Sequence, residues 1–182
     1  MSQSFPLQTS WTDTETFYEK DNFLFLGTMG FPDFGYPKNI MPSAYHDKRS
    51  LTIDSSYINL KRGFLTYTRP LIDAFQTKLQ MIGQTKCNNI IICTHYPIFE
   101  SQYLINTQED ISQYFYCHEL GILVENVARK YPLKNFYAVA AHGHEFNIGK
   151  WIQNEKNLFT HGLLTTYHEQ TYISLDVPFV ND

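Results

Sequence analysis

Short apolar runs that end at turn residues mark the candidate strands of this chain. The three clearest runs are Phe23–Thr28, Asn89–Thr94 and Phe136–Ala141. Unbroken runs of this kind are typical of strands that are buried on both faces of an α/β sheet. Shorter strand-like segments follow, at Asn147–Trp151, Leu158–His161 and Thr171–Val177. We therefore expect a buried central sheet and a C-terminal part rich in short strands.

Between the first and second runs, apolar residues recur at helical spacing. They are Ile72, Phe75, Leu79 and Ile82. This spacing predicts an amphipathic helix that begins after Thr68, with Pro70 in its first turn. Gly83 is placed to end the helix in a left-handed cap. The segment from Met29 to about Thr66 has no clear period and is rich in aromatic residues, so we expect a packed loop near the functional site.

A second amphipathic stretch precedes the third run and is stopped by Pro132. Its apolar positions are Leu120, Leu123, Val124, Val127 and Tyr131. Upstream of it, Asn106 and Glu109 have the spacing of a capping box, which predicts the start of a further helix. Helical segments therefore separate the apolar runs, as expected of an α/β chain.

The order of these elements predicts the fold class and the domain organisation. The chain has 182 residues, which fits one domain, and no repeat or linker divides it. Residues 1–22 are polar and rich in turn residues, so we expect an irregular N-terminal segment there. Residues 23–177 are expected to form an α/β fold with mixed β-sheets flanked by helices.

Composition narrows the class of protein. A hydrophobic content of 43% and an aromatic content of 16% can support a sizeable core. The net charge of −4 argues against nucleic-acid binding, and no apolar segment approaches the ~20 residues that cross a bilayer. Cys87, Cys93 and Cys117 lack metal-type spacing and are expected to be free thiols in a reducing compartment. A cytoplasmic protein without membrane contact is the simplest interpretation.

Histidines follow two of the buried runs. His95 comes directly after Asn89–Thr94, and His142 and His144 come directly after Phe136–Ala141. Ligands of open α/β sheets bind outside the ends of such strands. Imidazole is also the commonest side-chain ligand of transition metals. His95, His142 and His144 are therefore candidate metal ligands.

These segments resemble two motifs of the calcineurin-like metallophosphoesterases. Ile90–Pro97, which reads IIICTHYP, is similar to the strand and THxP motif of that superfamily. Ala141–His144 resembles its Gly-His-x-His motif, with Ala141 in place of the usual glycine. The resemblance implies that His95 and His142 bind one ion of a dinuclear centre and that His144 binds the other. The ions would be divalent Mn, Fe or Zn, and the substrate a phosphomonoester or phosphodiester.

The earlier motifs of the superfamily are missing from this chain. They are an Asp-x-His, a Gly-Asp-x-x-Asp and a Gly-Asn-His-Asp/Glu, and they supply the carboxylates of the metal site. The chain therefore resembles the C-terminal half of the fold only, and is expected to be a truncated phosphoesterase-like hydrolase. We expect it to self-associate or to pair with a chain that supplies the missing N-terminal half. The alternatives are a non-catalytic remnant or interaction module that retains the scaffold, and a mononuclear three-histidine zinc hydrolase.

A few further residues could contribute chemistry. Tyr96 and Phe99, just after His95, could line a substrate pocket. Cys93 precedes His95 in the strand and suggests a Cys–His nucleophile, although a free cysteine in an apolar run is more often a core residue. His161 follows a predicted strand and could neighbour the site.

Overall fold

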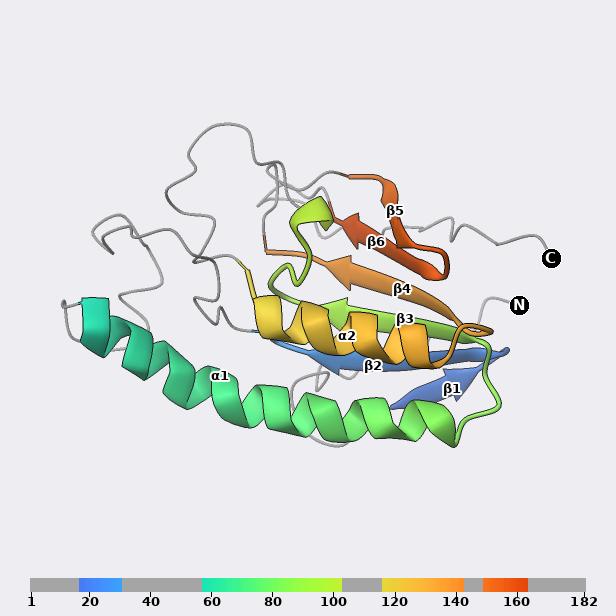
Figure 1. The fold of residues 1–182 in the computed structure, drawn as a ribbon, viewed down its shortest axis with the longest axis horizontal. Helices are drawn as coiled ribbons and strands as arrows, with labels where there is room; N and C mark the ends of the chain where they lie inside the picture. The colour runs from blue at the N-terminus through green and yellow to red at the C-terminus, as the bar shows by residue number, and fades with distance from the viewer. Residues whose placement is uncertain (1–16, 31–56, 103–115, 143–148, 164–182) are drawn as a thin grey trace, which may run out of the picture.

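A computed structural model of the chain describes residues 17–30, 57–102, 116–142 and 149–163. Within these residues one sheet carries helices on one of its faces (Figure 1). The elements are β1 (Tyr18–Lys20), β2 (Phe23–Thr28), α1 (Tyr57–Gln80), the 3₁₀ turn η3 (Met81–Gly83), β3 (Asn89–Thr94), the 3₁₀ turn η4 (Glu100–Gln102), α2 (His118–Lys130), β4 (Asn135–Ala140), β5 (Trp151–Glu155) and β6 (Leu158–Gly162).

The sheet has six strands in the order β1-β2-β3-β4-β6-β5. Its inner strands β2, β3, β4 and β6 are parallel, and the edge strands β1 and β5 are antiparallel to their neighbours. The expected α/β class with a mixed sheet is therefore confirmed. Parallel pairing also places the carboxyl ends of β2, β3, β4 and β6 at one edge of the sheet.

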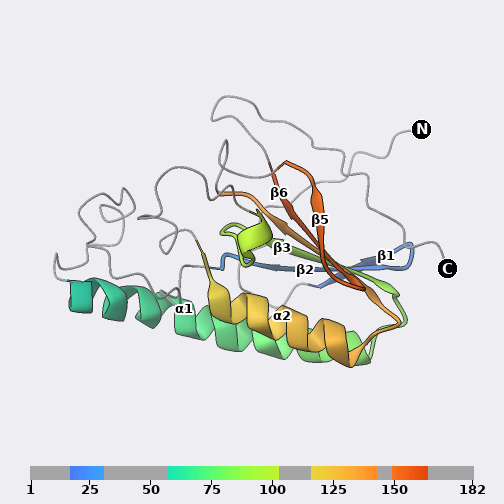
Figure 2. The same ribbon diagram turned by 45° about the horizontal axis from the view of Figure 1, so that its top comes forward.

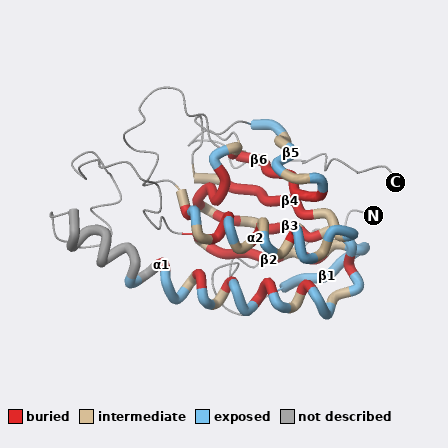
Figure 3. The backbone as a smooth tube through the Cα atoms, in the orientation of Figure 1, coloured by how far each residue is buried: buried red, intermediate tan, exposed pale blue. Residues whose placement is uncertain are grey.

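Both long helices cover the same face of the sheet (Figures 1 and 2). Alternate residues of the inner strands belong to the hydrophobic core, where they meet the apolar stripes of α1 and α2. Figure 3 shows this burial, concentrated in the inner strands and on the inward sides of both helices. The core includes Leu24, Leu26, Ile90, Ile92, Phe136 and Leu158 from the strands, with Ile72, Phe75, Leu79, Leu120, Val124 and Ala128 from the helices.

Helix α1 begins earlier than the sequence pattern predicts. It starts at Tyr57, so Pro70 lies inside the helix and not in its first turn. The prediction that the chain is irregular up to about Thr66 is therefore wrong at its C-terminal end. An apolar stripe is evident only from Ile72 onward, and a proline usually costs about 3 kcal/mol inside a helix. Both signals pointed to a later start.

The end of α1 also differs from the prediction. The helix tightens into η3, and Gln84 follows with a right-handed backbone, at φ −100°. Gly83 therefore does not form a left-handed cap. It serves instead for close approach, because a Cβ atom at this position would lie 2.5 Å from the Tyr131 hydroxyl oxygen.

The N-terminal segment that we expected to be irregular contains strand β1. A two-residue turn at Asp21 and Asn22 joins β1 to β2, with φ values of 48° and 65°. Two residues with positive φ are typical of a type I′ hairpin turn, which favours Asp and Asn. Asn22 also accepts a hydrogen bond from the backbone N–H of Asn88 at 2.8 Å, which ties the hairpin to the start of β3.

Toward the C-terminus, β6 agrees with its predicted range, but β5 does not. The strand predicted at Asn147–Trp151 begins outside the described residues, and the observed strand β5 runs from Trp151 to Glu155. It forms a hairpin with β6, so pairing with a neighbouring strand determined its position. The predicted strand Thr171–Val177 and the helix predicted from Asn106 fall outside the described residues.

Candidate functional site

The two motif histidines meet at the carboxyl end of the parallel strands. Strands β3 and β4 are neighbours, with Thr94 paired to Ala140. His95 and His142 follow these ends, and His95 Nε2 lies 2.8 Å from His142 Nδ1. The expected proximity of His95 and His142 is confirmed. His144 lies outside the described residues.

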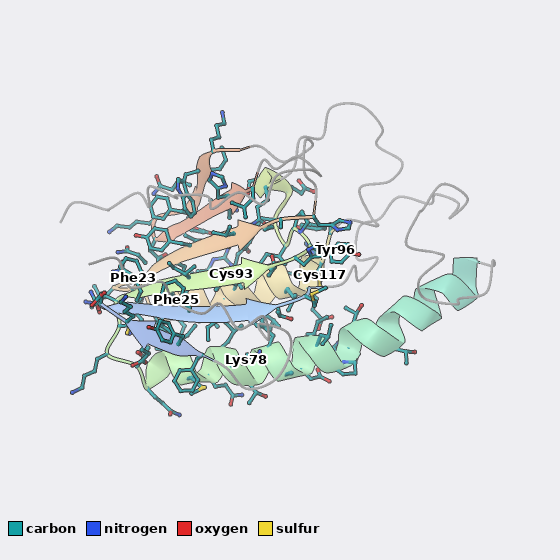
Figure 4. The ribbon with its side chains drawn as sticks, turned by 180° about the vertical axis from the view of Figure 1, so that it is seen from behind. Phe23, Phe25, Lys78, Cys93, Tyr96 and Cys117 are labelled. Carbon is teal, nitrogen blue, oxygen red and sulfur yellow. The ribbon has the colours of Figure 1, made fainter. Side chains whose placement is uncertain are left out.

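Tyr96 joins the two imidazoles in a cluster of three rings. The ring centroids of Tyr96 and His142 are 4.0 Å apart, with an interplanar angle of 35°. Tyr96 also meets His95 edge-to-face at 5.0 Å, and the two imidazoles are 4.7 Å apart. Figure 4 shows Tyr96 beyond the end of β3, the strand that carries Cys93. Each ring therefore contacts the other two.

Backbone hydrogen bonds hold the segments that carry these rings. The Tyr96 N–H donates to the Met29 carbonyl at 3.1 Å, which links the segment after β3 to the end of β2. The Ala141 N–H donates to the His95 carbonyl at 3.1 Å, which links it to the end of β4. The histidine cluster is therefore attached to three parallel strands.

The side chain of Gln102 holds the other end of the segment that follows His95 through hydrogen bonds. Its side chain is fully buried, and its Oε1 accepts hydrogen bonds from the N–H groups of Ile98 and Phe99 at 2.9 and 3.0 Å. Its Nε2 donates to the carbonyls of Ala138 at 3.0 Å and His161 at 3.4 Å. One amide thus connects the segment to β4 and β6. The sequence did not single out Gln102, because only the folded chain brings these backbone groups together.

Tyr96 and Phe99 are almost completely buried, at 3% and 4% exposure. Phe99 belongs to the hydrophobic core beneath α2. These side chains therefore support the segment after His95 from below. Their predicted contact with a substrate stays a prediction.

Cys93 lacks the properties of a nucleophile. Burial raises the pKa of its thiol to about 11, so the thiol is protonated at neutral pH. Reactive cysteines have a lowered pKa, because the thiolate is the attacking species. The structure therefore favours the alternative that Cys93 is an apolar residue of β3.

Among the residues that the structure describes, two buried side-chain atoms near the same end of the sheet have no hydrogen-bond partner. They are Thr28 Oγ1, at the last residue of β2, and His161 Nδ1, near the end of β6. Burial lowers the pKa of His161. Unsatisfied buried polar atoms are rare and often mark a place for water, an ion or a ligand. The sequence indicated His161 as a neighbour of the site but missed Thr28, whose only signal was its place at the end of an apolar run.

The facing nitrogens of His95 and His142 are compatible with one metal ion. Two imidazole nitrogens on a tetrahedral zinc ion, each at about 2.0–2.1 Å, lie roughly 3.3 Å apart. The observed separation of 2.8 Å is shorter by an amount that small side-chain movements can supply. Among the described residues, no group of three His, Cys, Asp or Glu side chains could hold a metal ion. In the described part of the chain, two imidazole nitrogens therefore face each other at this end of the sheet.

Within the ranges that the structure describes, no helix is long and apolar enough to cross a membrane. Comparison with protein-family models, curated proteins and solved structures gave no match to this chain.

Proposed function

We propose that this chain carries the histidine side of a divalent-metal site in a metallophosphoesterase-like hydrolase, in a partial version of that fold. The observation that supports this most is the 2.8 Å approach of His95 Nε2 and His142 Nδ1 at the ends of two parallel strands. Both histidines occupy the motif positions in which the resemblance implies ligands of one ion. His144, from the second motif, would bind the other.

The residues of this chain would hold the metal and organise its surroundings. Two divalent ions in such a site clamp a phosphoester and activate a water molecule for attack at phosphorus. In the metal-free contact, one of the two facing nitrogens carries a proton and the other accepts it. Metal binding requires both nitrogens to be unprotonated, so the ion takes the place of that proton. Tyr96, and the hydrogen-bonded segment that follows His95, keep the two imidazole rings at this end of the sheet.

The carboxylates that such a site needs are not among the described residues near the histidines. We propose that a second chain, or a second copy of this one, completes the site. If a second copy completes the site, the isolated chain is expected to elute from size-exclusion chromatography as an assembly larger than a monomer. A single monomer peak together with a cooperative melt would contradict this part of the proposal.

We place the protein in the cytoplasm, where its three free thiols remain reduced.

A second candidate function is a metal-binding or interaction module without turnover. The observation that favours it is that only two metal-type side chains meet among the described residues. Three imidazoles alone carry no charge to balance two divalent ions. This candidate predicts metal binding without phosphoesterase activity, so one experiment separates it from the hydrolase.

His142→Ala is expected to weaken zinc and manganese binding by roughly a hundredfold, since it removes one of two facing ligands. Isothermal titration of the purified chain measures the affinity, and a chromogenic phosphodiester measures turnover in parallel. His118→Ala serves as the control, because His118 is exposed on α2 and bonds to the Tyr116 hydroxyl. Metal binding with turnover supports the hydrolase, and metal binding alone supports the module. Equal affinities of wild type and His142→Ala would refute the ligand assignment.

A further inference from the structure

Resting on the proposed metal site, we propose that Tyr96 is a positioning residue that sets the ring plane of His142. The lone pair of an unprotonated imidazole nitrogen lies in the plane of the ring. The plane therefore determines the direction in which His142 Nδ1 can bind a proton or a metal ion. In the structure that direction leads to His95 Nε2, at 2.8 Å.

The geometry of the contact suits this role. The Tyr96 and His142 rings lie at 4.0 Å with an angle of 35°, so one face of the imidazole rests on the phenol ring. A tilted ring contact at this distance limits how far the imidazole can turn toward the phenol ring, while its edge stays open. The edge that carries Nδ1 remains directed at His95. Tyr96 meets the His95 ring edge-to-face, which fixes the second imidazole against the same support.

Tyr96 is held independently of the histidines. Its N–H is bonded to Met29, and its side chain is 3% exposed. Pro97 follows it, and a residue before proline is restricted to extended conformations. Gly30 passes close by with φ +64°, where an added Cβ atom would lie 3.6 Å from the Tyr96 carbonyl oxygen. Tyr96 is therefore held by groups other than the two imidazoles.

The role predicts a difference between aromatic and aliphatic replacements. Tyr96→Phe retains the ring face and is expected to bind zinc within about threefold of wild type. Tyr96→Leu removes the face, and the loss of a support of this kind weakens metal binding roughly tenfold or more. Substituting cobalt for zinc provides a spectroscopic check, since the visible absorption bands report the ligand arrangement. These bands are expected to change in Tyr96→Leu and to be retained in Tyr96→Phe.

A metal-free measurement separates this inference from the proposed function. The ring current of Tyr96 shields the carbon-bound protons of the His142 ring, so their NMR signals lie upfield in the apo protein. We expect this shift to persist in Tyr96→Phe and to vanish in Tyr96→Leu. A wild-type chain that binds no metal but shows the shift would refute the metal site and retain the positioning role. Unchanged His142 signals and unchanged zinc affinity in Tyr96→Leu would overturn the inference. If the Leu variant fails to fold, Tyr96→Met provides a second replacement without a ring.

Discussion

Gly121→Ala is expected to destabilise the protein by about 2 kcal/mol or more, although the same change stabilises most helices. Gly121 lies in α2, where it packs against the segment that follows His95. A Cβ atom at this position would lie 2.2 Å from the Ile98 carbonyl oxygen and 3.5 Å from Phe99 Cε1. The first of these atoms belongs to the backbone and cannot rotate away. The helix or the segment must therefore move.

Urea denaturation of the two proteins measures this effect. Asn126→Ala is a matched control, because Asn126 is exposed on the same helix and its replacement should be neutral or slightly stabilising. A displacement of the segment would also move His95 relative to His142, so zinc affinity is expected to fall along with stability. A Gly121→Ala protein as stable as the Asn126→Ala control would show that α2 does not pack against Ile98 as described.

Gln102→Leu is expected to lower the free energy of unfolding by about 3 kcal/mol. The replacement has a similar size but leaves the N–H groups of Ile98 and Phe99 without their acceptor. It also removes the donor to the Ala138 carbonyl. A buried polar group that loses its partner costs about 1–3 kcal/mol, and water has no access to this fully buried position.

Thermal and urea unfolding measure the stability of Gln102→Leu and of a control variant, Gln80→Leu. Gln80 is exposed at the end of α1 and makes no side-chain cap hydrogen bond, so its replacement should stay within about 0.5 kcal/mol of wild type. The Gln102 variant should also release the segment after His95, seen as faster hydrogen exchange at Ile98 and Phe99. Equal stability of the two variants would mean that the Gln102 network contributes nothing net.

The local pattern of apolar residues was sufficient to predict much of the fold. The predicted strands at Phe23–Thr28 and Asn89–Thr94 are observed with the same bounds, and the third strand is shifted by one residue. Every residue of these strands is buried or half-buried, so the apolar run and the element nearly coincide. The apolar stripe from Ile72 to Ile82 predicted its helix equally well, because the stripe faces the sheet. Predictions failed for β1 and β5, whose positions depend on pairing with a neighbouring strand, and for the start of α1, where no apolar stripe marks the first turns.

The candidate site, like the fold, could be predicted from the sequence only in part. His95 and His142 could be identified from sequence because each directly follows a buried run, and parallel strands end at one edge of a sheet. Sequence could not indicate that Tyr96 lies beneath His142, since the side chains of neighbouring segments meet only after the strands have paired. The sequence did not indicate the roles of Gln102 and Gly121, because Gln102 also bonds to Ala138 and His161 and Gly121 packs against Ile98, all of them distant in the chain.

By itself, the sequence determined the α/β class, the principal strands and helices, and the two histidines at strand ends. These features follow from short-range periodicity and from the burial of continuous apolar runs. Only the tertiary structure decided which nitrogens of His95 and His142 face one another, what supports their rings, and where glycine and glutamine are required. The physical reason is that packing and hydrogen bonding between distant segments depend on geometry in three dimensions, which a one-dimensional pattern does not contain.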